Sequence, residues 1–201
     1  MYMHAIHKFE TIRSHVLRKL ESQLSKDLYY HSVEHTVDVE AQAIRIAAAE
    51  NIVAEEDLFL LKIACLYHDT GFIFTYDHHE EIGCNLARKE LAEFGLDSRQ
   101  IEIVCGMINA TRIPQTPATK LEEIIADADL DYLGRDDFFP IGHQLYLELK
   151  AKNFVQTEND WNLVQVKFFR QHTYFTATTK ALRQQKKQMH LEIIEATLEL
   201  V

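Results

Sequence analysis

Three short segments of the chain concentrate histidine and aspartate, the side chains that bind divalent cations in proteins. Imidazole nitrogens and carboxylate oxygens together suit hard and borderline metal ions. The candidate ligands are His31, His35, His68, Asp69, Asp127, Asp129 and Asp131. A dipeptide such as His68-Asp69 is too common to indicate a function alone, so the prediction of a metal site depends on the three segments together.

The spacing of the histidines limits how they could share a cavity. His31 and His35 are four residues apart, so on a helix both would project from one face. Two unrelated histidines at a solvated helix start are the alternative. His68 and Asp69 are neighbours, which lie about 100° apart on a helix, so they could address one ion only where a helix ends. Gly71 permits such an end two residues beyond the pair.

The acidic cluster places three carboxylates within five residues. Asp127 and Asp131 would share a helical face and Asp129 would point elsewhere, so the three are not equivalent ligands. A solvated acidic face is one interpretation. The apolar neighbours Ile125 and Leu130 favour a partly buried site instead, where the repulsion between carboxylates is relieved by a cation.

Helices are the elements expected to position these segments. The chain has only 6 glycines and 3 prolines among 201 residues, and apolar residues recur at helical spacing in nearly every segment. We expect helices over about 9–24, 33–48, 57–69, 79–94, 98–108, 121–132 and 176–201. Asp57 and Asp97 are expected to cap two of them, and Thr157 with Asp160 forms a capping pattern before another. Only the threonine-rich stretch 173–179 has a competing strand pattern.

Composition narrows the class of protein further. With 47% apolar residues, no repeat and no linker, residues 1–201 are expected to form a single domain. The net charge of −10 argues against binding to duplex nucleic acid. No stretch resembles a signal core or a membrane span, and Cys65, Cys84 and Cys105 look like buried free thiols, so we expect a cytoplasmic protein without membrane contact.

The order of the three segments resembles a known family. The run Tyr30-His31-x-x-x-His35-Thr36, then His68-Asp69, then Ala128-Asp129 is similar to the HD superfamily of metal-dependent phosphohydrolases, which includes cyclic nucleotide phosphodiesterases. The resemblance covers about residues 29–134. It implies an all-α, single-domain HD-type helical bundle with the metal site between helices, followed by C-terminal helices over about 138–201.

The resemblance also assigns roles to single residues. It implies metal ligands at His35, His68, Asp69 and Asp129, and so selects one aspartate where spacing left three. His31 stands where phosphodiesterases carry the histidine that protonates the leaving oxygen. His79 resembles a histidine that adds a ligand for a second metal in binuclear branches.

These roles predict hydrolysis of a phosphate ester by metal-activated water. His31 or His79 would protonate the departing alkoxide, and an unliganded carboxylate, Asp127 or Asp131, would orient a histidine or the water. The resemblance implies a small phosphorylated substrate, most commonly a nucleotide or cyclic nucleotide.

Two arginines are the candidates for binding the phosphate, Arg112 and Arg135. The chain departs from the pattern of the family it resembles immediately after the His-Asp pair. Enzymes that hydrolyse ppGpp carry an acidic pair shortly after His-Asp, but this chain has Thr70 and Gly71 there. Phosphodiesterases carry a histidine at the position where this chain has Phe72. These departures argue against both branches. Trp161 and Phe168-Phe169 are expected in the core.

The sequence is compatible with several metals and with more than one class of activity. Mixed nitrogen and oxygen ligands suit Mn, Fe, Co, Ni or Zn, with Mg also considered, as one or two ions per chain. A diiron oxygenase of the same fold is a second interpretation, and it needs further histidines at a second iron. A non-catalytic regulatory module, in which metal only links helices, is a third. The apolar face of the last helix suits either the core or a homodimer interface.

Overall fold

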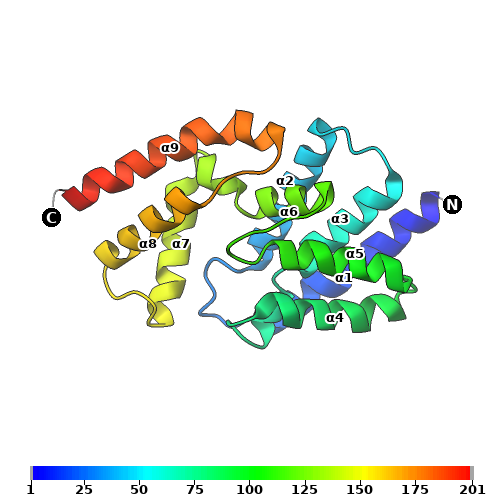
Figure 1. The fold of residues 1–201 in the computed structure, drawn as a ribbon. Helices are drawn as coiled ribbons and strands as arrows, with labels where there is room; N and C mark the ends of the chain where they lie inside the picture. The colour runs from blue at the N-terminus through cyan, green and yellow to red at the C-terminus, as the bar shows by residue number, and fades with distance from the viewer. Residues whose placement is uncertain (1, 200–201) are drawn as a thin grey trace.

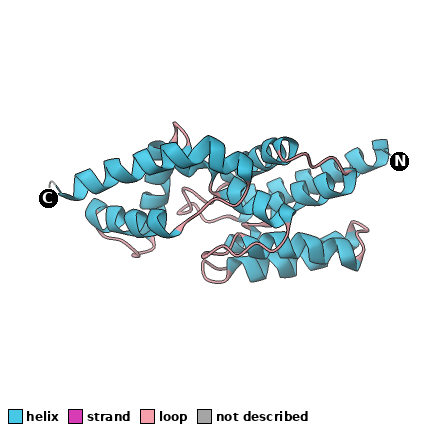
Figure 2. Cartoon of the chain, turned by 45° about the horizontal axis from the view of Figure 1, so that its top comes forward, coloured by secondary structure: helices cyan, strands magenta, loops and turns pink. Residues whose placement is uncertain are grey.

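The computed structural model describes residues 2–199, with side chains described over 7–198, and every regular element in that range is helical. The all-α prediction is therefore confirmed (Figures 1 and 2). The elements are α1 (Tyr2–Gln23), α2 (Val33–Ala49), α3 (Glu55–Tyr67), η1 (Thr70–Ile73), α4 (His79–Glu93), α5 (Ser98–Ala110), α6 (Lys120–Asp129), η2 (Asp131–Gly134), α7 (Phe138–Ala151), α8 (Glu158–Gln171) and α9 (Ala177–Glu199).

Two apolar clusters form the core. Helices α1 to α6 enclose the larger one, in which Ile12, Leu61 and Val104 are fully buried. A second cluster, which includes Phe138 and Phe169, lies beneath α7, α8 and α9, the helices on the left of Figure 1. The segments with the predicted ligands lie where the two groups of helices meet, because Tyr30 and Leu130, which flank them, belong to the second cluster.

Side-chain caps mark the starts of several helices. Asp97 and Thr157 each begin a helix with a capping box, as the sequence predicts. The prediction that Asp57 caps α3 is wrong. The helix begins at Glu55 after Ala54, and Asp57 lies in the first turn, where carboxylates interact favourably with the helix dipole.

The threonine-rich stretch forms a helix cap rather than a strand. The hydroxyl of Thr176 accepts the backbone N–H of Thr179 at 3.1 Å, and α9 starts at the next residue, Ala177. The local side-chain bond supplies the backbone partner that a strand would need from a neighbouring chain segment. Thr176 lies in the segment between α8 and α9, and it also contacts Asp127 of α6.

Gly71 allows a close approach that shapes the end of α3. A Cβ atom at this position would lie 1.9 Å from the backbone oxygen of His79, so only glycine fits. The short helix η1 therefore packs directly against the start of α4. This contact fixes the pair His68-Asp69, which immediately precedes η1, relative to His79.

The three cysteines are buried and free, as predicted. No helix among the described residues has the length and apolar character needed to cross a membrane.

Acid should destabilise the protein partly through His172. Burial, and then the nearby charge of Lys187, lower the pKa of His172 to about 3. Between that value and the unfolded value near 6.5, the unfolded chain binds a proton that the folded chain does not, so stability falls as pH falls, by roughly 1.4 kcal/mol per pH unit. In urea unfolding from pH 7 to pH 4, His172→Phe should show a shallower loss than the parent protein. Parallel curves for the two proteins would contradict this assignment.

Candidate metal centre

Four predicted ligands come from the ends of three helices. His35 lies in the first turn of α2, where its backbone N–H donates to the hydroxyl of Ser32, the helix cap. His68 is the C-terminal cap of α3, and Asp69 is the next residue. Asp129 is the last residue of α6. Because α2 packs against both α3 and α6, these ends meet at one point.

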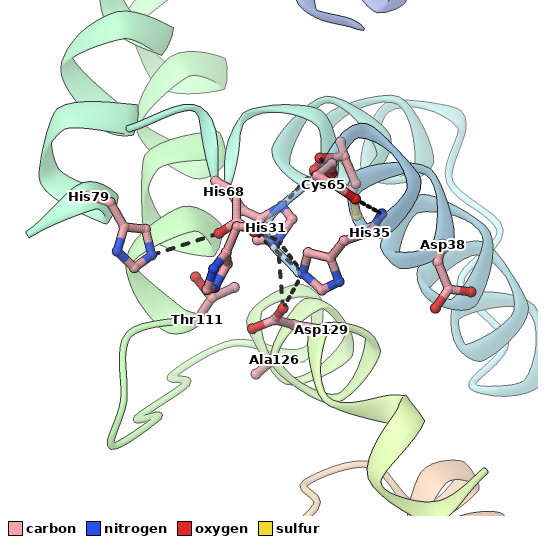
Figure 3. A network of polar contacts seen from close by, with 12 residues as sticks. His31, His35, Asp38, Cys65, His68, His79, Thr111, Ala126 and Asp129 are labelled. Carbon is pink, nitrogen blue, oxygen red and sulfur yellow. Dashed lines mark hydrogen bonds and ion pairs between the residues drawn. The ribbon is translucent and has the colours of Figure 1, made fainter. Parts of the chain in front are cut away.

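The ligand atoms converge closely (Figure 3). Nε2 of His35 lies 3.1 Å from Oδ1 of Asp129 and 3.4 Å from Oδ2 of Asp69. Nε2 of His68 lies 3.3 Å from Nε2 of His35 and 3.1 Å from Oδ2 of Asp69. The structure therefore brings together all four residues that the resemblance names.

The ring of His68 is held by its own helix. Its Nδ1–H donates to the backbone carbonyl of Cys65 at 2.7 Å, and the side chain is fully buried. This bond places the lone pair on Nε2, the atom that points at the other ligands. Metal-binding histidines are commonly oriented by such a bond on the opposite ring nitrogen.

The electrostatics of the cluster favour a positive charge at its centre. Burial alone would lower the pKa of His35, but its interactions with the carboxylates of Asp129 and Asp69 prevail and raise that pKa to about 9. Burial would raise the pKa of Asp129, yet the two imidazoles lower it to about 2. When no metal ion is bound, the negative carboxylates therefore favour protonated imidazole rings.

The donor set fits a divalent ion. His35, His68 and Asp129 each offer one ligand atom within 4.8 Å of the others. Oδ2 of Asp69 is buried beside them and has no hydrogen-bond partner among the described residues. A buried carboxylate oxygen without a partner is costly, and coordination to a cation would satisfy it. Two nitrogen and two oxygen ligands match borderline metals such as Mn, Fe, Co, Ni or Zn.

His31 lies beside this cluster but precedes α2, so the argument that His31 and His35 share one helical face does not apply. It precedes Ser32, the cap of α2, so its ring position is set by a loop. The imidazole Nδ1–H donates to Oε1 of Glu148, and the backbone N–H groups of Tyr30 and His31 donate to Oε2 at 3.0 and 3.1 Å. Nε2 is then the ring nitrogen free to act in the adjoining cavity.

Glu148 is the functional candidate that sequence reasoning missed. It lies on α7, outside the motif-bearing segments, and is fully buried. The Tyr76 hydroxyl also donates to it at 3.0 Å. Burial would raise the pKa of Glu148, but its hydrogen bonds, chiefly from His31, lower the pKa below its ordinary value. The one feature of the sequence that could point to this role is an acidic residue at an apolar position of α7.

His79 lies on the other side of Asp69, 3.7 Å from its Oδ1. The ring of Phe72 stacks between the rings of His79 and His31, with both centroid distances 3.9 Å. Phe72 thus separates the two histidines and holds each by packing. This accounts for the aromatic residue where phosphodiesterases carry another histidine. His79 and Glu80 are the neighbouring groups from which a second metal ion would draw ligands.

The two predicted phosphate-binding arginines already have acidic partners. Arg112 is exposed at the start of the loop after α5 and lies 3.5 Å from Glu80. Arg135 contacts Asp38 and Asp137 at 2.7 Å each and lines a separate cavity on the far side of His35. Neither side chain reaches the predicted ligands, so their roles remain predictions.

Asp127 is placed away from the centre, contrary to the role predicted for it. Its carboxylate accepts the backbone N–H groups of Phe175 and Thr176, both at 2.8 Å, and the hydroxyl of Thr176 at 2.7 Å. It therefore fixes the start of α9. Asp131, the other candidate for orienting a histidine, is held by Arg45 and Arg183 instead. The physical reason is that Asp127 faces α9 from another side of α6, whereas Asp131 lies beyond the end of α6, in η2.

Replacement of Asp127 should reduce stability without affecting metal binding. Asp127→Ala leaves two buried donors of Thr176 and the partly buried N–H of Phe175 without their acceptor, so we expect the free energy of unfolding in urea to fall by about 2–3 kcal/mol. The control Asp136→Ala removes a carboxylate that is 94% exposed. It should change stability by less than about 0.5 kcal/mol. A loss of bound metal specific to Asp127→Ala, in folded protein, would instead support the orienting role.

A cavity of about 230 Å³ opens directly from the candidate ligands. His31, Asp69, His79 and Asp129 line one end of it. The other end reaches between α7 and α8. A small molecule bound in this cavity would touch the cluster and the free nitrogen of His31 together.

Comparison with known proteins agrees with the motifs. The sequence model of the HD domain family matches residues 32–131, a range that contains all four ligand candidates. A structure from an uncultured Thermotogales bacterium, described as a predicted HD superfamily hydrolase, is 23% identical, with a TM-score of 0.60 over 92% of this chain and 91% of its own. A structure from Lactobacillus plantarum is 15% identical, with a TM-score of 0.64 over 97% and 98%. No curated protein matches the chain. The two structures establish a shared fold over nearly the whole chain.

Proposed function

Because the chain belongs to the HD superfamily, we propose that it is a metal-dependent hydrolase that cleaves a phosphate ester. The observation that carries the proposal is the convergence of His35, His68, Asp69 and Asp129 at one end of a cavity that His31 also lines. A ligand set alone would serve a structural ion equally well. A proton donor beside the ligands, at the same end of the cavity, is what a hydrolase adds to them.

A divalent ion bound by the four ligands would act as a Lewis acid and lower the pKa of a coordinated water. Side chains of the protein would perform the other functions that hydrolysis needs. Asp69 and Asp129 set the charge of the centre, and the bond from His68 to the Cys65 carbonyl keeps the ligand geometry fixed. His31, held by Glu148, presents Nε2 to the departing alkoxide. Such positioned proton donation typically contributes about 10²–10⁴-fold to rate.

The proposed substrate is a small phosphate ester. Nucleotides and cyclic nucleotides are the class that the family resemblance implies, and they belong in the first screen. Aromatic side chains in the cavity wall could pack against a base. The acidic residues at the centre favour substrates whose phosphate arrives together with a bound cation.

The test is a hydrolysis screen on protein stripped with chelator and reloaded with Mn²⁺, Co²⁺, Ni²⁺ or Mg²⁺. Phosphomonoesters, phosphodiesters and nucleotides are offered, and released phosphate or alcohol is measured. We expect turnover that depends on added metal. Absence of turnover with every metal would refute hydrolysis and leave the metal-linked regulatory module, whereas two equivalents of iron and oxygen consumption would identify the diiron alternative.

A further inference from the structure

We infer that the substrate of this site is an ester with a single phosphate whose organic group is uncharged and largely apolar. The inference rests on the proposed function and concerns the end of the cavity away from the ligands. That end is enclosed by apolar side chains of α7 and α8, which lie outside the segments that match the family. They are Leu145, Leu149, Trp161, Val164, Phe168 and Phe169.

The cavity accounts for apolar side chains on α8 whose positions are not explained by packing in the core alone. Trp161 and Phe169 are buried, as the sequence predicts, yet both also line the cavity. Val164, on the same helix, is 44% exposed at the cavity wall. Apolar surface that faces a pocket beside a candidate catalytic centre gains free energy when an apolar group of the substrate covers it.

The charges around the cavity argue against a second phosphate. Among the described residues that line it there is no lysine or arginine, and the carboxylates are Asp69, Glu80 and Asp129. The two nearest arginine candidates are engaged, Arg112 with Glu80 and Arg135 with Asp38 and Asp137. A nucleoside diphosphate or triphosphate would place further negative charge against these walls without a cationic partner.

The polar groups of the wall suit only a few hydrogen bonds. The hydroxyl of Tyr30 is buried and has no partner among the described residues, so it is available to one oxygen of a bound ester. Gln165 is the only amide side chain in the lining, and its Nε2 already donates to Asn162 at 3.2 Å. At about 230 Å³, below the usual range of drug-sized pockets, the cavity suits a compact alkyl or aryl group.

The first experiment measures binding without turnover. Methyl-, butyl-, hexyl- and phenylphosphonate are titrated calorimetrically into Mn²⁺-loaded protein. Because each buried methylene is worth about 0.8 kcal/mol, or roughly a 4-fold change in affinity, hexylphosphonate should bind at least ~30-fold more tightly than methylphosphonate. Equal affinity across the series would overturn the inference.

Two adjacent positions on α8 provide a matched pair of variants. Val164→Lys places a cation at the cavity wall, whereas Leu163→Lys places it at an exposed neighbour, 53% accessible, that does not line the cavity. Val164→Lys should weaken hexylphosphonate about 10-fold and strengthen binding of the ATP analogue AMP-PNP, and Leu163→Lys should change neither. Both side chains can reach solvent, so both variants should fold. Identical effects of the two variants would also overturn the inference.

Hydrolysis distinguishes this inference from the proposed function. We expect hexyl and phenyl phosphate to be cleaved with a kcat/KM at least ~10-fold above that of glycerol 3-phosphate or ATP. No turnover together with chain-length-dependent phosphonate binding would sink the proposed function and leave the apolar pocket standing. Turnover that prefers ATP or glycerol 3-phosphate would leave the hydrolase and refute the pocket assignment.

Discussion

Replacement of His68 by glutamine should remove the bound metal and the turnover together. His68 is fully buried, and its Nε2 lies within 3.1–3.6 Å of donor atoms from the other three ligand candidates. Glutamine roughly preserves the volume but cannot place a nitrogen lone pair at that point. Partners that merely orient ligands are worth about 10–100-fold in metal affinity, so losing a ligand itself should exceed about 100-fold.

The measurement is metal content by elemental analysis after dialysis against a weak chelator, paired with phosphate release. His190→Gln is the matched control. His190 is also a buried histidine whose Nδ1 bonds to a backbone carbonyl, that of Leu133 at 2.9 Å, but it lies on α9 among aromatic side chains. It should keep full metal content. Circular dichroism of both variants establishes folding, and a folded His68→Gln protein that retains one equivalent of metal would overturn the ligand set.

The helices and the ligand-bearing ends were predictable because both depend on local sequence. Helical periodicity and capping residues set boundaries such as those at Asp97 and Thr157. The His68-Asp69 pair could be placed at a helix end because Gly71 follows it, and the structure shows why that glycine is required. The selection of Asp129 over its neighbours needed the family resemblance, since spacing only separates the faces of a helix.

The remainder of the site depends on contacts between distant segments, which periodicity does not encode. Glu148 meets His31 across 117 residues of chain, and nothing near Glu148 marks it as more than a charged position on α7. Its closeness to Asp129 in sequence predicts a role for Asp127 at the centre, but its carboxylate oxygens accept bonds from the segment that starts α9. In sequence Phe72 stands where phosphodiesterases carry a histidine, whereas in space its ring packs against the rings of both His31 and His79.

Glu148→Gln should slow the reaction only where the leaving group needs a proton. Glutamine can still accept from the backbone N–H groups of Tyr30 and His31 through its amide oxygen, so the loop should keep its position. The negative charge next to Nδ1 is lost, and with it the charge-assisted bond that stabilises a protonated ring. For an alkyl phosphate, whose alkoxide is a poor leaving group, we expect kcat to fall about 100-fold.

The 4-nitrophenyl ester separates this role from a structural one. Its leaving group departs without protonation, so Glu148→Gln should retain most of the parent kcat on 4-nitrophenyl phosphate and keep its bound metal. The control Glu90→Gln changes another buried carboxylate, which accepts a tyrosine hydroxyl at 2.9 Å and pairs with Lys19 at a distant helix. It should leave the ratio of the two rates unchanged. If Glu148→Gln slows both esters equally, Glu148 acts on the fold of the loop, and His31 must be replaced as the proposed proton donor by His79.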